Sequence, residues 1–130
     1  MGYKIGQAAA ASGLPVKTVR YYADIGLVVP GRTEADYRVY SDGEVAKLTF
    51  VRRARAFGFS VEECRELLGL YEDRDRASAD VKRIALERLA EIETRLAELE
   101  RLRDELRHLA DACAGNQRPD CPILGAFAAA

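Results

Sequence analysis

Residues 12–26, Ser-Gly-Leu-Pro-Val-Lys-Thr-Val-Arg-Tyr-Tyr-Ala-Asp-Ile-Gly, decide the fold predicted for this chain. Gly13 suits the C-terminal cap of a short helix over residues 3–12, and Pro15 stands at or near the first turn of a second helix. The second helix is predicted to run from Val16 to about Ile25 and to stop at the glycine that follows. Two short helices joined by a tight glycine turn form a helix-turn-helix candidate.

The second helix carries cations and hydroxyls close together: Lys17, Thr18, Arg20, Tyr21 and Tyr22. Contacts with phosphates and base edges need such groups. An ordinary solvated helix whose tyrosines pack inward accounts for the same residues equally well. This segment by itself leaves both interpretations open.

A small hairpin is predicted after the second helix. Residues 27–29, Leu-Val-Val, form a short strand-like run, and residues 37–40, Tyr-Arg-Val-Tyr, alternate and are rich in strand-forming types. A polar turn over residues 32–36 separates them. We interpret the hairpin as a wing, from which Arg32, Arg38 and the tyrosines can reach a nucleic-acid backbone.

Two capping boxes predict two more helices in the same domain. Ser41 is followed three residues later by Glu44, and Ser60 is followed three residues later by Glu63. The second of these helices is expected to continue to Leu70.

A long helix is predicted from Ser78 onward. No proline or glycine occurs from residue 79 to residue 110, so the helix is on the order of 48 Å long. Its apolar residues recur at spacings of three and four, which is typical of a coiled-coil seam; they are Leu89, Ile92, Leu96, Leu99, Leu102, Leu106 and Leu109. The short N-terminal part offers nothing to cover this stripe, so a homodimer is favoured over a helix that folds back on its own domain.

Two cysteines, Cys113 and Cys121, stand eight positions apart after this helix, with turn-forming residues between them. Thiolates are soft ligands that favour Cu(I), and two sulfurs alone suit linear coordination. A structural zinc site usually needs four nitrogen or sulfur ligands, and the single histidine, His108, lies upstream on the helix. From the loop alone, a metal site, a disulfide and two inert thiols all remain open.

The composition excludes several classes of protein. The chain has 130 residues, 48% hydrophobic and 32% charged, and no apolar run approaches the length that spans a bilayer. Its three cysteines, an odd number, argue against a disulfide framework, and we interpret Cys64 as a core residue. Without a signal-peptide pattern, we expect a cytoplasmic protein.

The charge is divided unevenly along the chain. Residues 1–60 carry 9 Lys and Arg against 5 Asp and Glu, whereas residues 61–130 carry 11 against 16. A basic front half indicates a polyanionic partner, although chance drift of charge explains so small an excess as well.

Taken together, these segments resemble the MerR family of transcriptional regulators along nearly the whole chain. In the back half the chain resembles the copper-efflux regulator branch (CueR/HmrR type). The matching strings are Val19–Tyr22, Gly26–Val28, Tyr37–Tyr40, Arg52–Arg55, Gly58–Ser60, Ser78–Lys82 and the two loop cysteines followed by Pro122–Leu124.

The resemblance implies a mainly α protein. A winged helix-turn-helix DNA-binding domain with accessory helices (1–70) would be followed by a connector (71–78) and a dimerisation helix in an antiparallel coiled coil (79–111). A C-terminal metal-binding loop with a last apolar turn (112–124) and a tail (125–130) would complete the chain.

The resemblance also assigns residues. The DNA contacts it implies are Lys17, Thr18, Arg20, Tyr21, Arg32, Tyr37, Arg38, Tyr40 and Arg55. Cys113 and Cys121 would bind Cu(I), or Ag(I) or Au(I) in its place. Ser78 stands where the divalent-metal branches carry a cysteine, and in the antiparallel dimer it would approach the loop of the other chain and disfavour Zn(II) or Hg(II).

The implied function is transcription activation without enzymatic activity. A homodimer would bind promoter DNA and, on binding metal, distort it so that its elements are realigned for RNA polymerase. Pro15 departs from the family, because many relatives carry a Ser or Thr cap there. The residues also permit a thiol-disulfide redox-responsive DNA-binding regulator, and a small metal carrier or dithiol oxidoreductase is a third, weaker alternative.

Overall fold

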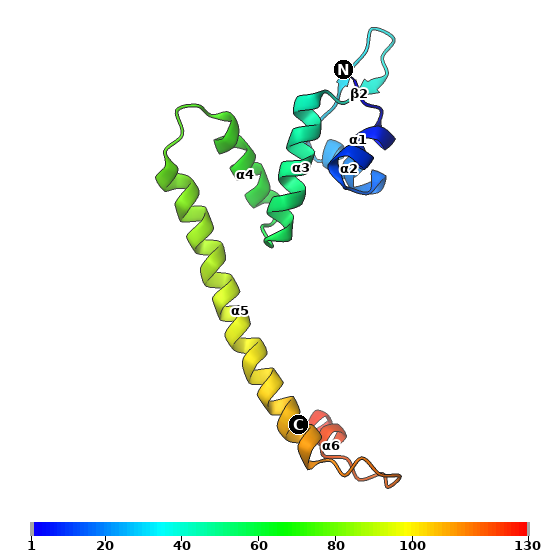
Figure 1. Cartoon of the computed structure of the whole chain (residues 1–130), viewed down its shortest axis with the longest axis vertical. Coiled ribbons are helices and arrows are strands. Elements are labelled where there is room, and N and C mark those ends of the chain that lie inside the picture. The colour runs from blue at the N-terminus through cyan, green and yellow to red at the C-terminus, as the bar shows by residue number, and fades with distance from the viewer. Residues whose placement is uncertain (1, 130) are drawn as a thin grey trace. The chain divides into compact units, whose positions relative to one another are not determined.

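Helices dominate the computed structural model, which describes residues 2–129 (Figure 1). The residues up to Ala85 form one compact unit, and those from Leu86 onward form a second. Within residues 2–129, no helix combines the length and the apolar composition that a bilayer crossing requires.

The predicted helix-turn-helix is present in the first unit as α1 (Ile5–Ser12) and α2 (Val16–Asp24). Gly13 ends α1 with a φ of 75°, a left-handed conformation that only glycine adopts at little cost. The N–H of Leu14 then donates to the carbonyl of Ala9 at 3.1 Å. The chain therefore reverses between the helices at the predicted glycine.

The wing is a two-stranded antiparallel sheet of β1 (Gly31–Arg32) and β2 (Arg38–Val39), in which Gly31 pairs with Val39. The predicted strand over 27–29 is wrong. The N–H groups of Leu27 and Val28 both donate to the carbonyl of Tyr22, at 2.9 and 3.2 Å, and their side chains are buried. This apolar run therefore caps α2 and enters the core instead of joining the sheet.

Both capping boxes begin helices, as predicted. The hydroxyl of Ser41 accepts from the N–H of Glu44 at the start of α3 (Asp42–Ala56), and Ser60 with Glu63 does the same for α4 (Val61–Glu72). Together with α1 and α2, these helices enclose one apolar core. Its buried residues are Ala8, Ala9, Val19, Tyr22, Leu27, Val28, Tyr40, Leu48, Val51, Ala54, Cys64 and Leu68.

The long helix is α5 (Ser78–Ala112), and it continues from the first unit into the second. Beyond the loop, α6 runs over Pro122–Ala128, so residues 125–128 of the predicted tail are helical. Pro122 occupies the first turn, where its missing N–H is no loss, and Gly125 sits inside the helix with its N–H donating to the carbonyl of Cys121 at 3.0 Å.

Candidate metal centre and nucleic-acid interface

The two loop cysteines come together between α5 and α6. Cys113 follows the last residue of α5, and its N–H still donates to the carbonyls of Leu109 and Ala110, both at 3.2 Å. Gly115 then turns the chain with a φ of 65°. Both thiols are half-buried and free, and the thiol of Cys113 hydrogen-bonds to the sulfur of Cys121.

Cys121 occupies the N-cap position of α6. The N–H of Leu124 donates to its sulfur and does most to lower the pKa of this thiol, while burial acts in the opposite direction. The N–H of Ile123 and the thiol of Cys113 lower the pKa further. Donors that face a sulfur stabilise its thiolate, which is the form that binds metals. The loop therefore favours the thiolate of Cys121, the form that can bind a cation.

The soft ligands that this loop offers are its two sulfurs. Among residues 2–129, no group of three or more His, Cys, Asp and Glu side chains is placed to hold a metal ion. A tetrahedral zinc site would need more donors, whereas a soft monovalent ion accepts a pair of thiolates. The donor set thus fits a soft monovalent ion and does not fit structural zinc.

Three of the predicted DNA-contacting residues stand on the surface of α2. Lys17, Arg20 and Tyr21 are exposed, and Thr18 is half-buried in the same helix. Buried Val19 and Tyr22 fasten the opposite side of α2 to the core. Because the amphipathic packing fixes which side faces outward, these polar groups are presented together.

The wing presents the second set of predicted contacts. Arg32, Tyr37 and Arg38 are exposed, and Tyr37 is 72% accessible. A cleft of about 550 Å³ lies between the wing, α2 and the start of α1. Lys4 lines this cleft together with Arg20 and Arg38, so three cations from distant parts of the sequence converge on it. Lys4 was not among the predicted contacts, although it is the only charged residue among the first 16.

Tyr40 and Arg55 are placed differently from the other predicted contacts. The ring of Tyr40 is buried under the wing, and its hydroxyl has no hydrogen-bond partner among the described residues. Arg55 is exposed, but its Nη1 donates to the carbonyl of Phe59 at 2.6 Å, and its guanidinium also bonds to the hydroxyl of Tyr22. Tyr40 therefore packs inside the first unit, whereas Arg55 links residue 59 and Tyr22 at its surface, and a direct DNA contact by either one stays a prediction.

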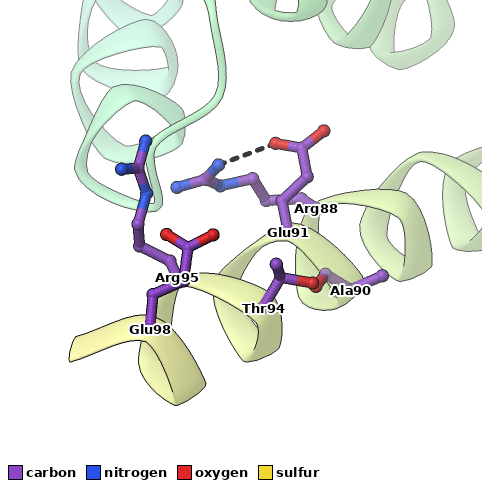
Figure 2. Close-up of a pocket in the computed structure, with 6 residues that line it drawn as sticks. All are labelled: Arg88, Ala90, Glu91, Thr94, Arg95 and Glu98. Atoms are coloured by element: carbon purple, nitrogen blue, oxygen red, sulfur yellow. Dashed lines mark hydrogen bonds and ion pairs between the residues drawn. The ribbon is translucent and has the colours of Figure 1, made fainter. Parts of the chain in front are cut away.

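The apolar stripe of α5 is open along the single chain. Leu99 and Leu102 are 58% and 60% exposed, and the stripe's other leucines and Ile92 are similarly open, except for half-buried Leu109. On another side of the helix, charges pair along the surface: Arg88 Nη1 lies 2.8 Å from Glu91 Oε2 (Figure 2). The hollow lined there belongs to α5 itself and contains neither loop cysteine. The stripe is therefore the face of α5 that needs a partner helix.

Ser78 is exposed and is the first residue of α5, whereas Cys113 follows the last one. Ser78, the predicted selectivity residue, and the loop that begins with Cys113 therefore lie at opposite ends of α5.

Comparison with known proteins identifies the family. Residues 3–70 match the family described as MerR HTH family regulatory protein, and residues 45–109 match the one described as MerR, DNA binding. The chain belongs to the MerR family. Members of this family are regulators of transcription and not enzymes, and this chain is such a regulator. One of its family models is described as DNA binding, and the solved structure of EcmrR, which is 26% identical to this chain, contains EcmrR with DNA.

Relatives with similar sequences cover nearly the whole MerR-family chain. The HTH-type transcriptional regulator HmrR of Rhizobium leguminosarum bv. viciae is 59% identical over 120 residues, which is 92% of this chain and 93% of the relative. The HTH-type transcriptional regulator CueR of Salmonella typhimurium is 46% identical over 121 residues, covering 92% of this chain and 88% of the relative.

Two solved MerR-family structures are similar to this chain over its full length. PbrR691 of Ralstonia metallidurans CH34, in complex with lead(II), has a TM-score of 0.82 and 31% identity and covers 97% of this chain and 99% of its own. MerR of Bacillus megaterium MB1, in complex with mercury(II), has a TM-score of 0.70 and 28% identity and covers 96% and 98%. The predicted fold class is confirmed by these neighbours.

Proposed function

We propose that this MerR-family chain is a cytoplasmic, Cu(I)-responsive activator of transcription, with Ag(I) or Au(I) able to replace Cu(I). The observation that carries the proposal is the pair of sulfurs at Cys113 and Cys121. They hydrogen-bond to each other and, among the described residues, belong to no group of three or more His, Cys, Asp and Glu side chains placed to hold a metal. The names of its relatives fit this proposal, since one of them is called a heavy metal-dependent transcription regulator.

The donor set is also the basis for selectivity. The family fold accommodates lead(II) in PbrR691 and mercury(II) in MerR, so the fold by itself does not choose the metal. A third thiolate favours divalent soft ions. By the resemblance, the divalent-metal branches carry a cysteine at the position of Ser78, and this chain lacks that thiolate there. Because Ser78 begins α5 and Cys113 follows its end, the serine facing each loop would be the partner's Ser78 in an antiparallel dimer.

The chain's own residues prepare the loop for the ion. The N–H groups of Ile123 and Leu124 hold the sulfur of Cys121 in place at the start of α6. The last turn of α5 fixes the backbone of Cys113, whose N–H donates to two helix carbonyls. Bound Cu(I) would supply the positive charge that both thiolates share. Holding both sulfurs together ties the end of α5 to the start of α6.

Regulation then follows from a change at the dimer helices. The loop lies directly between α5, which carries the open leucine stripe, and α6. We propose that ordering this loop changes the angle between the two DNA-binding units of the dimer. The promoter is then bent and untwisted until its elements align for RNA polymerase, so that the energy of DNA deformation is the regulated quantity. A metal needs to favour the active state by only about 1–3 kcal/mol to have a clear effect on output.

Substitution of either loop cysteine tests the proposal. Cys113→Ser and Cys121→Ser should bind promoter DNA as tightly as the wild type, because the DNA-binding unit ends before the loop. Neither variant should activate transcription when Cu(I) is added in a reconstituted assay with RNA polymerase. Cys64→Ala, which removes a buried thiol far from the loop in sequence, is the matched control and should keep the response. A copper response that survives in either loop variant would place the metal site elsewhere.

A further inference from the structure

Both helices of the helix-turn-helix receive an arginine at their C-terminal ends. Neither α1 nor α2 has a basic residue in its own last turn. Helix C-termini carry unpaired carbonyls and a partial negative charge, which a cation stabilises. Arg52 of α3 donates from Nε to the carbonyl of Ser12 at 2.8 Å. Arg65 of α4 likewise donates to a backbone carbonyl at the end of α2.

Arg65 makes two bonds at once with two different nitrogens. Its Nη2 donates to the carbonyl of Ile25 at 3.0 Å, and its Nη1 donates to the carbonyl of Gly26 at 3.2 Å. Ile25 is the C-cap of α2, and Gly26 has a φ of 73°, so both carbonyls point in directions set by the end of the helix. Because the planar guanidinium bonds to two fixed carbonyls, it restrains the orientation of α4 relative to the end of α2 as well as their distance.

α4 and α2 also contribute to the same apolar core. α4 packs on α3, and its buried Cys64 and Leu68 belong to the core cluster that includes Val19 and Tyr22 of α2. Apolar burial holds the helices together, but it has little directional preference. The guanidinium of Arg65, which bonds to two carbonyls at the end of α2, therefore restrains the angle between α4 and α2.

The neighbouring residue links α4 in the other direction. Glu66 Oε1 lies 3.2 Å from Nη2 of Arg83, in the part of α5 that belongs to the first unit. Consecutive residues of α4 thus contact the end of α2 and the base of α5. A displacement at the base of α5 can therefore be transmitted to α2 through polar contacts of α4 alone.

We propose that Arg65 is a positioning residue for α2, the recognition helix of the helix-turn-helix. It fixes the angle of α2 against α4, and in this way it sets how well the protein distinguishes its operator from other DNA, without contacting the DNA itself. The proposal rests on DNA binding by a MerR-family chain and needs no metal, so its test is independent of the copper response.

The test uses the full-length chain with Arg65→Met, which keeps the aliphatic stem, and Arg65→Lys, which keeps the charge but has no fork. Affinity is measured for a duplex selected from a random-sequence pool by the wild type and for a scrambled duplex, over a range of salt concentrations. Arg65→Met should bind the selected duplex roughly tenfold more weakly, the equivalent of about 1.4 kcal/mol, because charged hydrogen bonds are lost. Arg65→Lys should lose less.

Affinity for the scrambled duplex and the slope of affinity against salt should not change in either variant. Glu62→Gln is the control: it removes the exposed ion pair between Glu62 Oε2 and Arg65 Nε at 3.6 Å and leaves the two carbonyl bonds intact. It should behave as the wild type.

Three results would overturn the proposal. A salt slope that falls by the equivalent of about one phosphate contact would make Arg65 a direct DNA ligand. An equal loss of affinity for both duplexes, together with a lower melting temperature, would mean that Arg65 only supports the fold. Unchanged discrimination in Arg65→Lys and Arg65→Met would remove the role altogether.

Discussion

Asp36 in the wing has a left-handed backbone, and its carboxylate faces Arg32, a predicted DNA-contact residue. Its φ of 66° is left-handed, which Asp tolerates better than most residues other than glycine. Its carboxylate lies 3.3 Å from Nη1 of Arg32, and its carbonyl accepts from the same nitrogen at 3.1 Å. In free protein, an acidic side chain therefore neutralises a cation that is predicted to meet phosphate.

We expect Asp36→Asn to bind DNA more tightly. Asn tolerates the left-handed backbone equally well, and the free energy of unfolding should change by less than about 1 kcal/mol, since the pair is exposed. Removing the negative charge should raise affinity about two- to fivefold at low salt, and the gain should shrink as salt screens it. Fluorescence anisotropy with a short promoter duplex measures both effects. Weaker binding would show that Asp36 instead holds Arg32 in its DNA-binding orientation.

Cys64 differs from the loop cysteines because it is fully buried, and burial raises the pKa of its thiol. The folded state keeps this thiol protonated, so its contribution to stability is complete below the ordinary thiol pKa. That contribution falls as the pH rises beyond this value, because only the unfolded chain ionises. Iodoacetamide should label Cys113 and Cys121 in native protein and Cys64 only after unfolding.

Cys64→Ser should lower the free energy of unfolding by about 1–3 kcal/mol, because it buries a hydroxyl without an assured partner. Cys64→Ala should cost less and should abolish the part of the alkaline destabilisation that comes from this thiol. Urea titrations at neutral and alkaline pH measure both quantities. Equal stability of the Ser and Ala variants would contradict the apolar environment assigned to this site.

Among the helices, α5 carries the strongest requirement for a partner. Leu99 lies at the middle of the exposed stripe, and Leu99→Ala should weaken dimerisation at least tenfold, because truncating a buried leucine costs about 2–5 kcal/mol. Alanine favours helix, so α5 itself should persist. Sedimentation equilibrium measures the change, and Glu100→Ala on the same helix is the control. An unchanged dimer would move the interface to another face of α5.

Local signals in the sequence predicted most of the helices. The boxes of Ser41 with Glu44 and of Ser60 with Glu63 are complete within four residues, so the start of each helix could be read directly. The strand predicted over 27–29 was wrong, because strand-forming residues also suit an extended segment whose N–H groups cap a helix. Residues 125–128 were predicted to be part of the tail, but they continue α6, since a helix tolerates one glycine at a cost of about 1 kcal/mol.

Contacts between distant residues could not be predicted. Arg52 and Arg65 each reach a carbonyl 39 or 40 positions away, and only the packing of α3 and α4 brings them there. The convergence of Lys4, Arg20 and Arg38 on one cleft depends on the same packing. The cysteine pair was found from sequence because only a short turning loop separates its members, but the donors that lower the pKa of Cys121 depend on α6.

For the molecule as a whole, charge and chemistry are divided between the two units. The exposed cations of α2 and the wing belong to the first unit, which includes the more basic half of the sequence. The cysteine pair and the open leucine stripe belong to the second. The proposed regulator therefore reads DNA with one unit and senses metal with the other, and α5 is the covalent connection between them.

The central claim is that two thiolates, without further ligands from the same loop, select a soft monovalent ion. The most direct measurement is an anaerobic titration of the reduced dimer with Cu(I) against a competing chelator, with Zn(II) titrated in parallel. We predict tight binding of one Cu(I) per chain, its loss in Cys113→Ser, and no comparable binding of Zn(II). Tight binding of Zn(II), or the absence of tight Cu(I) binding to the wild type, would contradict the account.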